Sequence, residues 1–149
     1  MQEYSRILPA VALSDRLRGC GYPWNKVWDL RRTGGVECFD EDLFSYEDKL
    51  WCVRMYRRCS RILLMPDIFY DYFQTEESLS REARGDREKA RRKRANALKA
   101  YDRILEELPQ GSPAALAAAL FRAKTVVMGK IRQQHCDRKR TKTDIETKK

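Results

Sequence analysis

The chain has 149 residues, with 31 Lys or Arg and 22 Asp or Glu, which gives a formal net charge of +9 at pH 7. This length fits one domain with a modest core and argues against a multidomain enzyme. The positive charge favours partners of negative potential, namely RNA, anionic lipid head groups or acidic protein surfaces, and it does not choose among them.

The cysteines and the apolar runs exclude several other classes. The five cysteines form neither the closely spaced pairs of a zinc site nor a regular disulfide pattern, so we expect reduced thiols, no metal and no cofactor. No run of about 18 apolar residues occurs, so we expect no transmembrane span. Pro9 lies inside the short apolar stretch of residues 1–19, which disfavours a secretory signal, whereas Arg6, Arg16 and Arg18 keep an internal mitochondrial targeting signal open.

The first 44 residues lead up to the central helix. Residues 1–20 are expected to form a short amphipathic segment that ends at a pair of glycines. Residues 21–44 combine turn residues with large apolar anchors, so they should be rich in loops. We expect Trp24, Val27 and Trp28 to share one helical turn that inserts into a groove, either in the core or at an interface, because exposed tryptophans are costly.

A helix with two chemically different faces is predicted from Ser45 onward. Ser45 followed by Asp48 is typical of a helix start, and Pro66 should stop the helix at about Met65. At about 100° per residue, the apolar side chains fall on one side. These are Cys52, Met55, Tyr56, Cys59, Ile62 and Leu63. The arginines Arg54, Arg57, Arg58 and Arg61 fall on the opposite side.

We expect these arginines to bind acidic groups of other chains or lipid phosphates, because like charges on one helix face repel one another when they are unpaired. The alternative is a core helix with a solvated arginine face. Cys52 and Cys59 should be buried and reduced, since about 10 Å of helix separates them. An aromatic cluster after Pro66 should bury a large area. With the arginines, the remaining candidate partner-binding residues are Trp24, Trp28, Phe69, Tyr70, Tyr72 and Phe73.

The next predicted helix, from Thr75 to about Leu108, has two different halves. Residues 80–96 are polar all round apart from alanines, so this half should project into solvent or onto a partner. Its basic run is suited to phosphates or to an acidic surface, and the structural alternative is a solvated helix supported by pairs such as Glu88 with Arg92. The run consists of Arg87, Lys89, Arg91, Arg92, Lys93 and Arg94.

A third helix should fold back on the second. The stretch from Pro109 to Gly111 stops the second helix, and Ser112 followed by Pro113 is typical of a new helix start. The hairpin should be antiparallel and should pack an apolar stripe of one helix against that of the other. The two stripes are Ala97, Leu98, Tyr101, Ile104, Leu105 and Leu108 on the second helix, and Leu116, Leu120, Ala123, Val127 and Ile131 on the third.

We therefore predict a mostly α fold with an irregular N-terminal region, a central amphipathic helix and a C-terminal helical hairpin. Residues 1–136 should form a single α-helical domain that includes the loop-rich segment 21–44. The basic tail, residues 137–149, should be disordered unless a partner orders it.

The sequence lacks the patterns of a stand-alone enzyme. Its single histidine, His135, lies next to the basic tail, without the cysteine or acid pattern of a nucleophilic triad. Glycine-rich phosphate loops are missing, and the acidic patch Asp40–Asp42 lacks the spacing of a calcium loop. We therefore expect no catalytic residues.

Two stretches resemble families of mitochondrial proteins. Met55-Tyr56-Arg57, with Arg61 and Phe69 downstream, is similar to the motif of the LYR family, small three-helix proteins whose arginine-rich first helix contacts partner subunits or an acyl carrier protein. Residues 12–66 resemble the ubiquinol–cytochrome c reductase binding protein family, subunit seven of the mitochondrial cytochrome bc complex. The second resemblance is carried by Ala12 to Arg18, a glycine shortly after, Trp24 to Asp29, an acidic segment, and Arg54 with Arg57.

The second resemblance implies a mostly α, non-catalytic subunit on the matrix face of that complex, without a cleaved presequence. The leading hypothesis is an accessory subunit of a mitochondrial inner-membrane respiratory-chain complex, docked on its matrix side. Its partners would be other subunits of a large hetero-oligomer, together with anionic lipid head groups. The alternatives are an RNA-binding structural protein of an organellar ribosome and an LYR-type assembly factor.

Overall fold

The computed structural model describes residues 21–61, 63, 70–71, 73 and 86–146, with side chains as far as residue 134. In this part of the chain the structure is helical and contains no strand, which confirms the mostly α prediction. The elements are η1 (Pro23–Asn25), α2 (Leu30–Thr33), α3 (Glu47–Arg57), α5 (Arg87–Glu107) and α6 (Pro113–Glu146).

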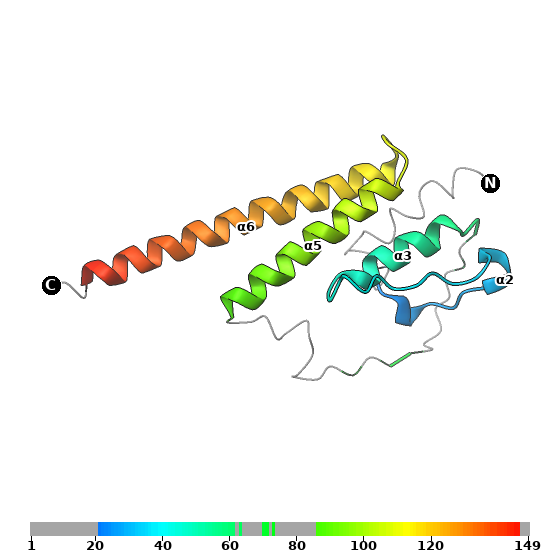
Figure 1. The fold of residues 1–149 in the computed structure, drawn as a ribbon, viewed down its shortest axis with the longest axis horizontal. Helices are drawn as coiled ribbons and strands as arrows, with labels where there is room; N and C mark the ends of the chain where they lie inside the picture. The colour runs from blue at the N-terminus through cyan, green and yellow to red at the C-terminus, as the bar shows by residue number, and fades with distance from the viewer. Residues whose placement is uncertain (1–20, 62, 64–69, 72, 74–85, 147–149) are drawn as a thin grey trace.

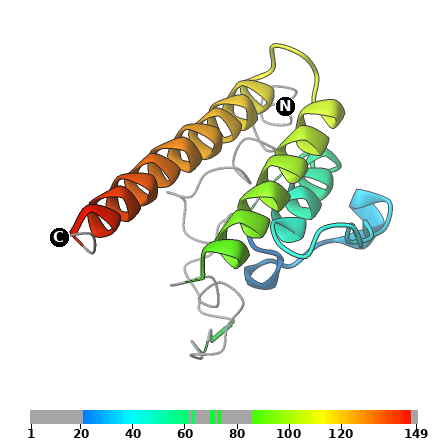
Figure 2. The ribbon, with the colours of Figure 1, turned by 60° about the vertical axis from the view of Figure 1, so that its left-hand side comes forward.

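The two long helices α5 and α6 form the predicted antiparallel hairpin (Figure 1). Helix α3 packs beside α5 near the closed end of this hairpin. Figure 2 shows the same arrangement from a second side, with α3 beside α5. The hairpin turn uses Gly111, whose φ of 72° is accessible to glycine at little cost. The Ser112 Oγ then accepts a hydrogen bond from the backbone N–H of Ala115 at 3.1 Å. The stop signal and the helix start around residue 112 are thus confirmed.

Helix α3 is shorter than predicted. It begins at Glu47, after Tyr46 in a left-handed conformation (φ 68°), and Ser45 is not its cap. It ends at Arg57, far before Pro66, because the N–H groups of Arg58 and Cys59 bond to carbonyls three residues back and tighten the last turn. Beyond this end, Leu63 is 77% exposed, so its predicted place on the buried face is wrong, and Ile62 lies outside the described residues.

Helix α3 is also buried on more sides than a two-faced helix would be. Cys52, Met55 and Tyr56 are buried as predicted, and Trp51 is buried with them. The buried ammonium group of Lys49 lies over the rings of Tyr46 and Phe121, at 5.8 and 5.7 Å from their centroids. The helix therefore runs through the core and does not lie on its surface. The side chains of Leu50 and Val53 on this helix are buried as well.

The carboxyl group of Asp48, in the first turn of α3, gives the fold a pH dependence. Burial, and then the charge of Glu47, raise its pKa above the ordinary 3.8. The folded state then binds this proton more tightly than the unfolded state, so the free energy of unfolding falls as pH rises from 3.8 through the raised pKa. We expect Asp48→Asn to abolish this loss. Urea denaturation of both proteins at about pH 3.5 and about pH 6 tests this, and an identical pH dependence would contradict it.

The cysteines differ in exposure. Cys38 is exposed, Cys52 is buried, and Cys59 is only partly buried, which departs from the prediction for Cys59. Burial raises the pKa of the Cys59 thiol. Because the thiolate is the reactive form, we expect iodoacetamide to label Cys38 first, Cys59 more slowly and Cys52 last. Peptide mass spectrometry after timed labelling of the native chain measures this order, and early labelling of Cys52 would contradict it.

The α5 side of the hairpin follows the prediction. Ala97, Tyr101, Ile104 and Leu108 are buried, and Leu98 and Leu105 are partly buried. The α6 side does not follow it. The buried positions of its first turns are Ala114, Ala115 and Ala118, whereas the predicted inner stripe is exposed, with Leu120 at 72%. Small alanines let α6 approach the other helices closely, and the rings of Tyr101 and Phe121 stack at 6.3 Å to fill the space beside them.

The C-terminal end of α6 is another departure. The helix continues past Asp137 to Glu146, where the sequence predicts a tail that stays disordered unless a partner orders it. Once a helix is nucleated, each added residue costs little, and arginine, lysine and glutamate are good helix formers. The helix therefore extends well beyond the start of α5 (Figure 1).

Candidate functional site

The arginines of α3 are engaged within the chain. Arg54 contacts the Oε1 atom of Glu107 at 2.7 Å, and Arg57 contacts its Oε2 atom at 3.3 Å. Arg58 forms an ion pair with Glu37 and lies 3.5 Å from the carbonyl of Thr33. These ion pairs attach α3 to α5 and to the preceding loop. Three of the four predicted docking arginines thus have internal acidic partners; Arg61, the fourth, is exposed.

The acidic patch Asp40–Asp42 attaches the loop to α5. Arg103 of α5 forms an ion pair with Asp40 and donates from Nη2 to Asp42 at 2.8 Å. Lys99 lies 3.5 Å from the same Asp42 carboxylate. The Nε1 atom of Trp51 donates to the carbonyl of Glu37 at 2.7 Å and holds the loop from the other side. Sequence reasoning missed these contacts, and the ion pairs among them join residues about sixty positions apart.

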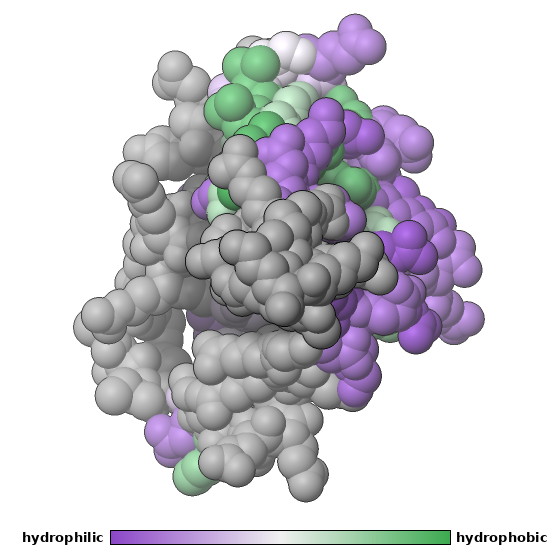
Figure 3. Space-filling view, turned by 90° about the vertical axis from the view of Figure 1, so that its left-hand side faces the viewer, coloured by the Kyte–Doolittle hydropathy of each residue, from purple (hydrophilic) through white to green (hydrophobic). Residues whose placement is uncertain are grey.

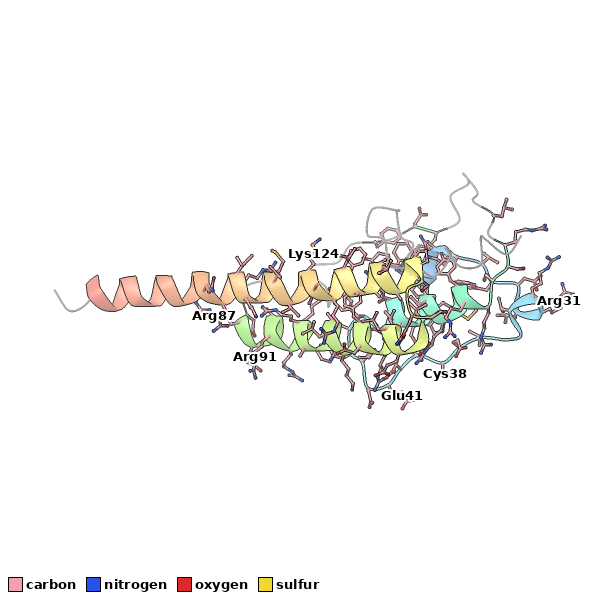
Figure 4. The ribbon with its side chains drawn as sticks, turned by 90° about the horizontal axis from the view of Figure 1, so that it is seen from above. Arg31, Cys38, Glu41, Arg87, Arg91 and Lys124 are labelled. Carbon is pink, nitrogen blue, oxygen red and sulfur yellow. The ribbon has the colours of Figure 1, made fainter. Side chains whose placement is uncertain are left out.

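The basic run lies on the first turns of α5 and is exposed in part. Figure 4 shows Arg87 and Arg91 at the start of α5, far along the molecule from Arg31 on α2. Arg91 pairs with Glu88 at 3.3 Å, and the guanidinium group of Arg92 lies 5.7 Å from the ring centroid of Phe44.

Two members of the run reach further toward the hairpin core. Lys93 and Arg94 are partly buried, and Arg94 fits against α6 where Gly129 has no side chain, because a Cβ there would come within 2.8 Å of it. The run therefore combines structural cations with exposed ones. The exposed members are Arg87, Lys89, Arg91 and Arg92.

The predicted aromatic residues divide between core and surface. Trp28 packs its ring against Trp51 and Tyr56, at centroid distances of 5.5 and 5.4 Å. Trp24 lies in η1 and does not share a helical turn with Trp28, and Val27 between them is 95% exposed, so the predicted single turn is wrong. The backbone is extended at Tyr22 before η1 and again at Lys26 after it, so η1 is a single short turn.

An exposed row of three stacked rings is the main aromatic feature of the surface. The rings of Tyr22 and Trp24 stack at 5.3 Å, and those of Trp24 and Tyr70 at 5.0 Å. The exposed fractions of these residues are 49%, 37% and 49%. We call this set the aromatic row. Phe73 is 84% exposed, whereas Phe69 and Tyr72 lie outside the described residues.

A second apolar surface, which we call the outer stripe, runs along α6. It consists of the residues that were predicted to face α5, namely Leu116, Leu120, Ala123, Val127 and Ile131, all of which are exposed. Lys124 lies on the same helix, on the edge of the hairpin away from Arg91 (Figure 4). A periodicity of apolar residues identified the stripe in the sequence, although it placed the stripe on the wrong side.

Neither a metal site nor a membrane span emerges from the described parts of the chain. No three His, Cys, Asp or Glu side chains gather there in a way that suits a metal ion. The helices that are described there lack the length and apolar character needed to cross a bilayer. Comparison with protein-family models, curated proteins and solved structures gave no match to this chain.

Proposed function

We propose that this chain is a non-catalytic accessory subunit of a larger protein assembly. The observation that carries the proposal is the aromatic row, in which Trp24 is stacked between two tyrosines that are each about half exposed. Tyrosine and tryptophan are enriched at protein interfaces, where a rigid ring covers a large area and loses little conformational entropy. Exposed aromatic rings that already support one another are suited to insertion into a partner.

Many large hydrophobic side chains of the described chain are exposed. Contiguous exposed apolar patches mark interaction sites in soluble proteins. Besides the aromatic row, the exposed large hydrophobic residues of the described chain include Leu30, Phe39, Phe44, Leu116, Leu120, Val127 and Ile131. An assembly that covers several of these surfaces is the simplest explanation of their number.

The finer proposal is that the assembly is a respiratory-chain complex and that the chain docks on the matrix side of the mitochondrial inner membrane. Its support is the resemblance of residues 12–66 to the ubiquinol–cytochrome c reductase binding protein family. Arg54 and Arg57 belong to that resemblance, but in this fold they pair with Glu107. Docking would therefore depend on the aromatic row and other exposed apolar groups more than on these arginines.

Fractionation of native cell extracts tests this proposal. The tagged chain should sediment with a large complex, resist ribonuclease, and stay bound as salt is raised, because apolar docking is not screened. Trp24→Ala should reduce its incorporation about thirtyfold, as expected for an aromatic hot spot worth about 2 kcal/mol. Val27→Ala is the control, since Val27 is near Trp24 in the sequence, is 95% exposed and is not a member of the aromatic row. Sedimentation as a free chain would overturn the proposal.

RNA binding in an organellar ribosome is the second candidate, and the exposed cations at the start of α5 favour it. Arg87, Lys89 and Arg91 lie on the outside of the hairpin, where they can reach phosphates. Binding through them should weaken steeply and linearly on a log–log salt plot, and ribonuclease should release the chain. Substituting Gln for Arg87 and Arg91 should then reduce both affinity and salt dependence, an outcome that the accessory-subunit proposal does not predict.

A further inference from the structure

We infer that the outer stripe of α6 is a docking face for an amphipathic helix of a partner protein, and that acidic residues flank the apolar seam of that helix. The inference rests on the proposed function, because it names the kind of partner that one surface of the subunit takes. It concerns a different surface from the aromatic row.

The first line of evidence is that α6 is apolar on two opposite sides. Ala114, Ala115 and Ala118 are buried against the rest of the fold. Leu116 and Leu120 point the other way and are 59% and 72% exposed. A helix that is apolar all round is normally covered all round. Seen from the C-terminal end of α6, hydrophobic surface gathers in the upper part of the molecule, beside a hydrophilic band (Figure 3).

The second line of evidence is the shape of the stripe. Leu116, Leu120, Ala123 and Val127 are separated by four, three and four residues, which is the spacing of a coiled-coil seam. With Ile131, the stripe extends along about 22 Å of helix at 1.5 Å per residue. The stripe is narrower than the apolar face of a helix that lies in a membrane surface, because Lys124 borders it directly. The small side chain of Ala123, within the stripe, lets a second helix approach closely.

The third line of evidence is charge. Lys124 and Lys130 are exposed next to the stripe, and the sequence contains no Asp or Glu between Pro113 and Cys136. A second copy of α6 would therefore bring lysines and arginines together without acids to pair with them. Acidic residues at the flanks of a partner helix would pair with these cations and fix its register.

A matched pair of valine variants tests this inference in the tagged full-length chain. Val127 on the stripe is 53% exposed, and Val36 on the loop before α3 is 59% exposed. We expect Val127→Asp to lower incorporation into the native assembly at least tenfold and Val36→Asp to leave it within twofold, with unchanged circular dichroism for both. If the wild-type chain enters no assembly, the proposed function fails. If the wild type and both variants assemble equally well, the function stands and the inference about the stripe is wrong.

Carbodiimide crosslinking of the native assembly identifies what covers the stripe, because it joins lysine amines to carboxylates in direct contact. Lys124 or Lys130 should be linked to Asp or Glu of a helix in another polypeptide. Links to a second copy, or to another carboxylate of the same chain, would overturn the inference. So would binding of the free chain to vesicles of phosphatidylcholine and phosphatidylglycerol that Val127→Asp abolishes.

Discussion

Replacing Ile104 by alanine should lower the free energy of unfolding by about 3 kcal/mol, whereas Leu120→Ala should change it by less than about 0.5 kcal/mol. Ile104 is fully buried in the cluster that α3, α5 and α6 share, so its truncation removes apolar contacts and leaves a cavity. Leu120 is 72% exposed, so its truncation opens no cavity. Alanine is the better helix former in both cases, and helix propensity therefore does not explain the difference.

Urea denaturation followed by circular dichroism measures both values in the isolated chain. The pair is informative because the apolar periodicity of the sequence places both side chains between the two long helices. Equal destabilisation by both substitutions would contradict the observed rotation of α6 and support the predicted one. In the native assembly, Leu120→Ala should instead weaken incorporation, because the outer stripe then faces its partner.

Glu107→Ala should lower the free energy of unfolding by about 2 kcal/mol, the second largest effect that we expect. Glu107 receives contacts from Arg54 at 2.7 Å and from Arg57 at 3.3 Å. The side chains of Glu107 and Arg54 are each only 25% exposed, so the ion pair is partly shielded from water. Without Glu107, the two guanidinium groups lose their shared acceptor and repel each other at the junction of α3 and α5.

The neighbouring Glu106→Ala is the control for Glu107→Ala, because Glu106 is exposed and precedes it on the same helix. Its substitution should change stability by less than about 0.5 kcal/mol. Chemical denaturation by urea, which leaves ion pairs unscreened, compares the two variants. If both variants are equally stable, the arginines of α3 do not depend on Glu107, and their role as docking groups for other chains becomes the better explanation.

Local sequence signals predicted several features of this protein correctly. Ser112 and Pro113 start α6, because a serine cap and a proline at the first position act within a single turn. The apolar stripe of α5 from Ala97 to Leu108 faces the core, with Leu98 and Leu105 partly buried, since a single periodic face allows only one orientation toward a core. The helical class and the hairpin follow from such signals, which involve residues a few positions apart.

The ion-pair partners of the acidic patch and of the α3 arginines could not be predicted from local sequence, because the tertiary structure determines them. Arg103 with Asp40 and Asp42, and Arg54 with Glu107, pair across more than fifty residues, and no local pattern specifies such partners. The sequence therefore predicts partners in other chains for these arginines, whereas in the fold Arg54, Arg57 and Arg58 pair with acidic residues of their own chain. The partners in an ion pair are the charged side chains that the packed helices bring close together.

From its amino acids alone, α6 carries two apolar sides, one of alanines and one of larger residues. Which of these sides faces the core depends on how the helices pack against one another. Hydrophobicity favours burying Leu116 and Leu120, yet the close approach of α3 and α5 leaves room only for small side chains such as Ala115 and Ala118. The bulkier stripe remains outside because packing depends on shape as well as on apolar area.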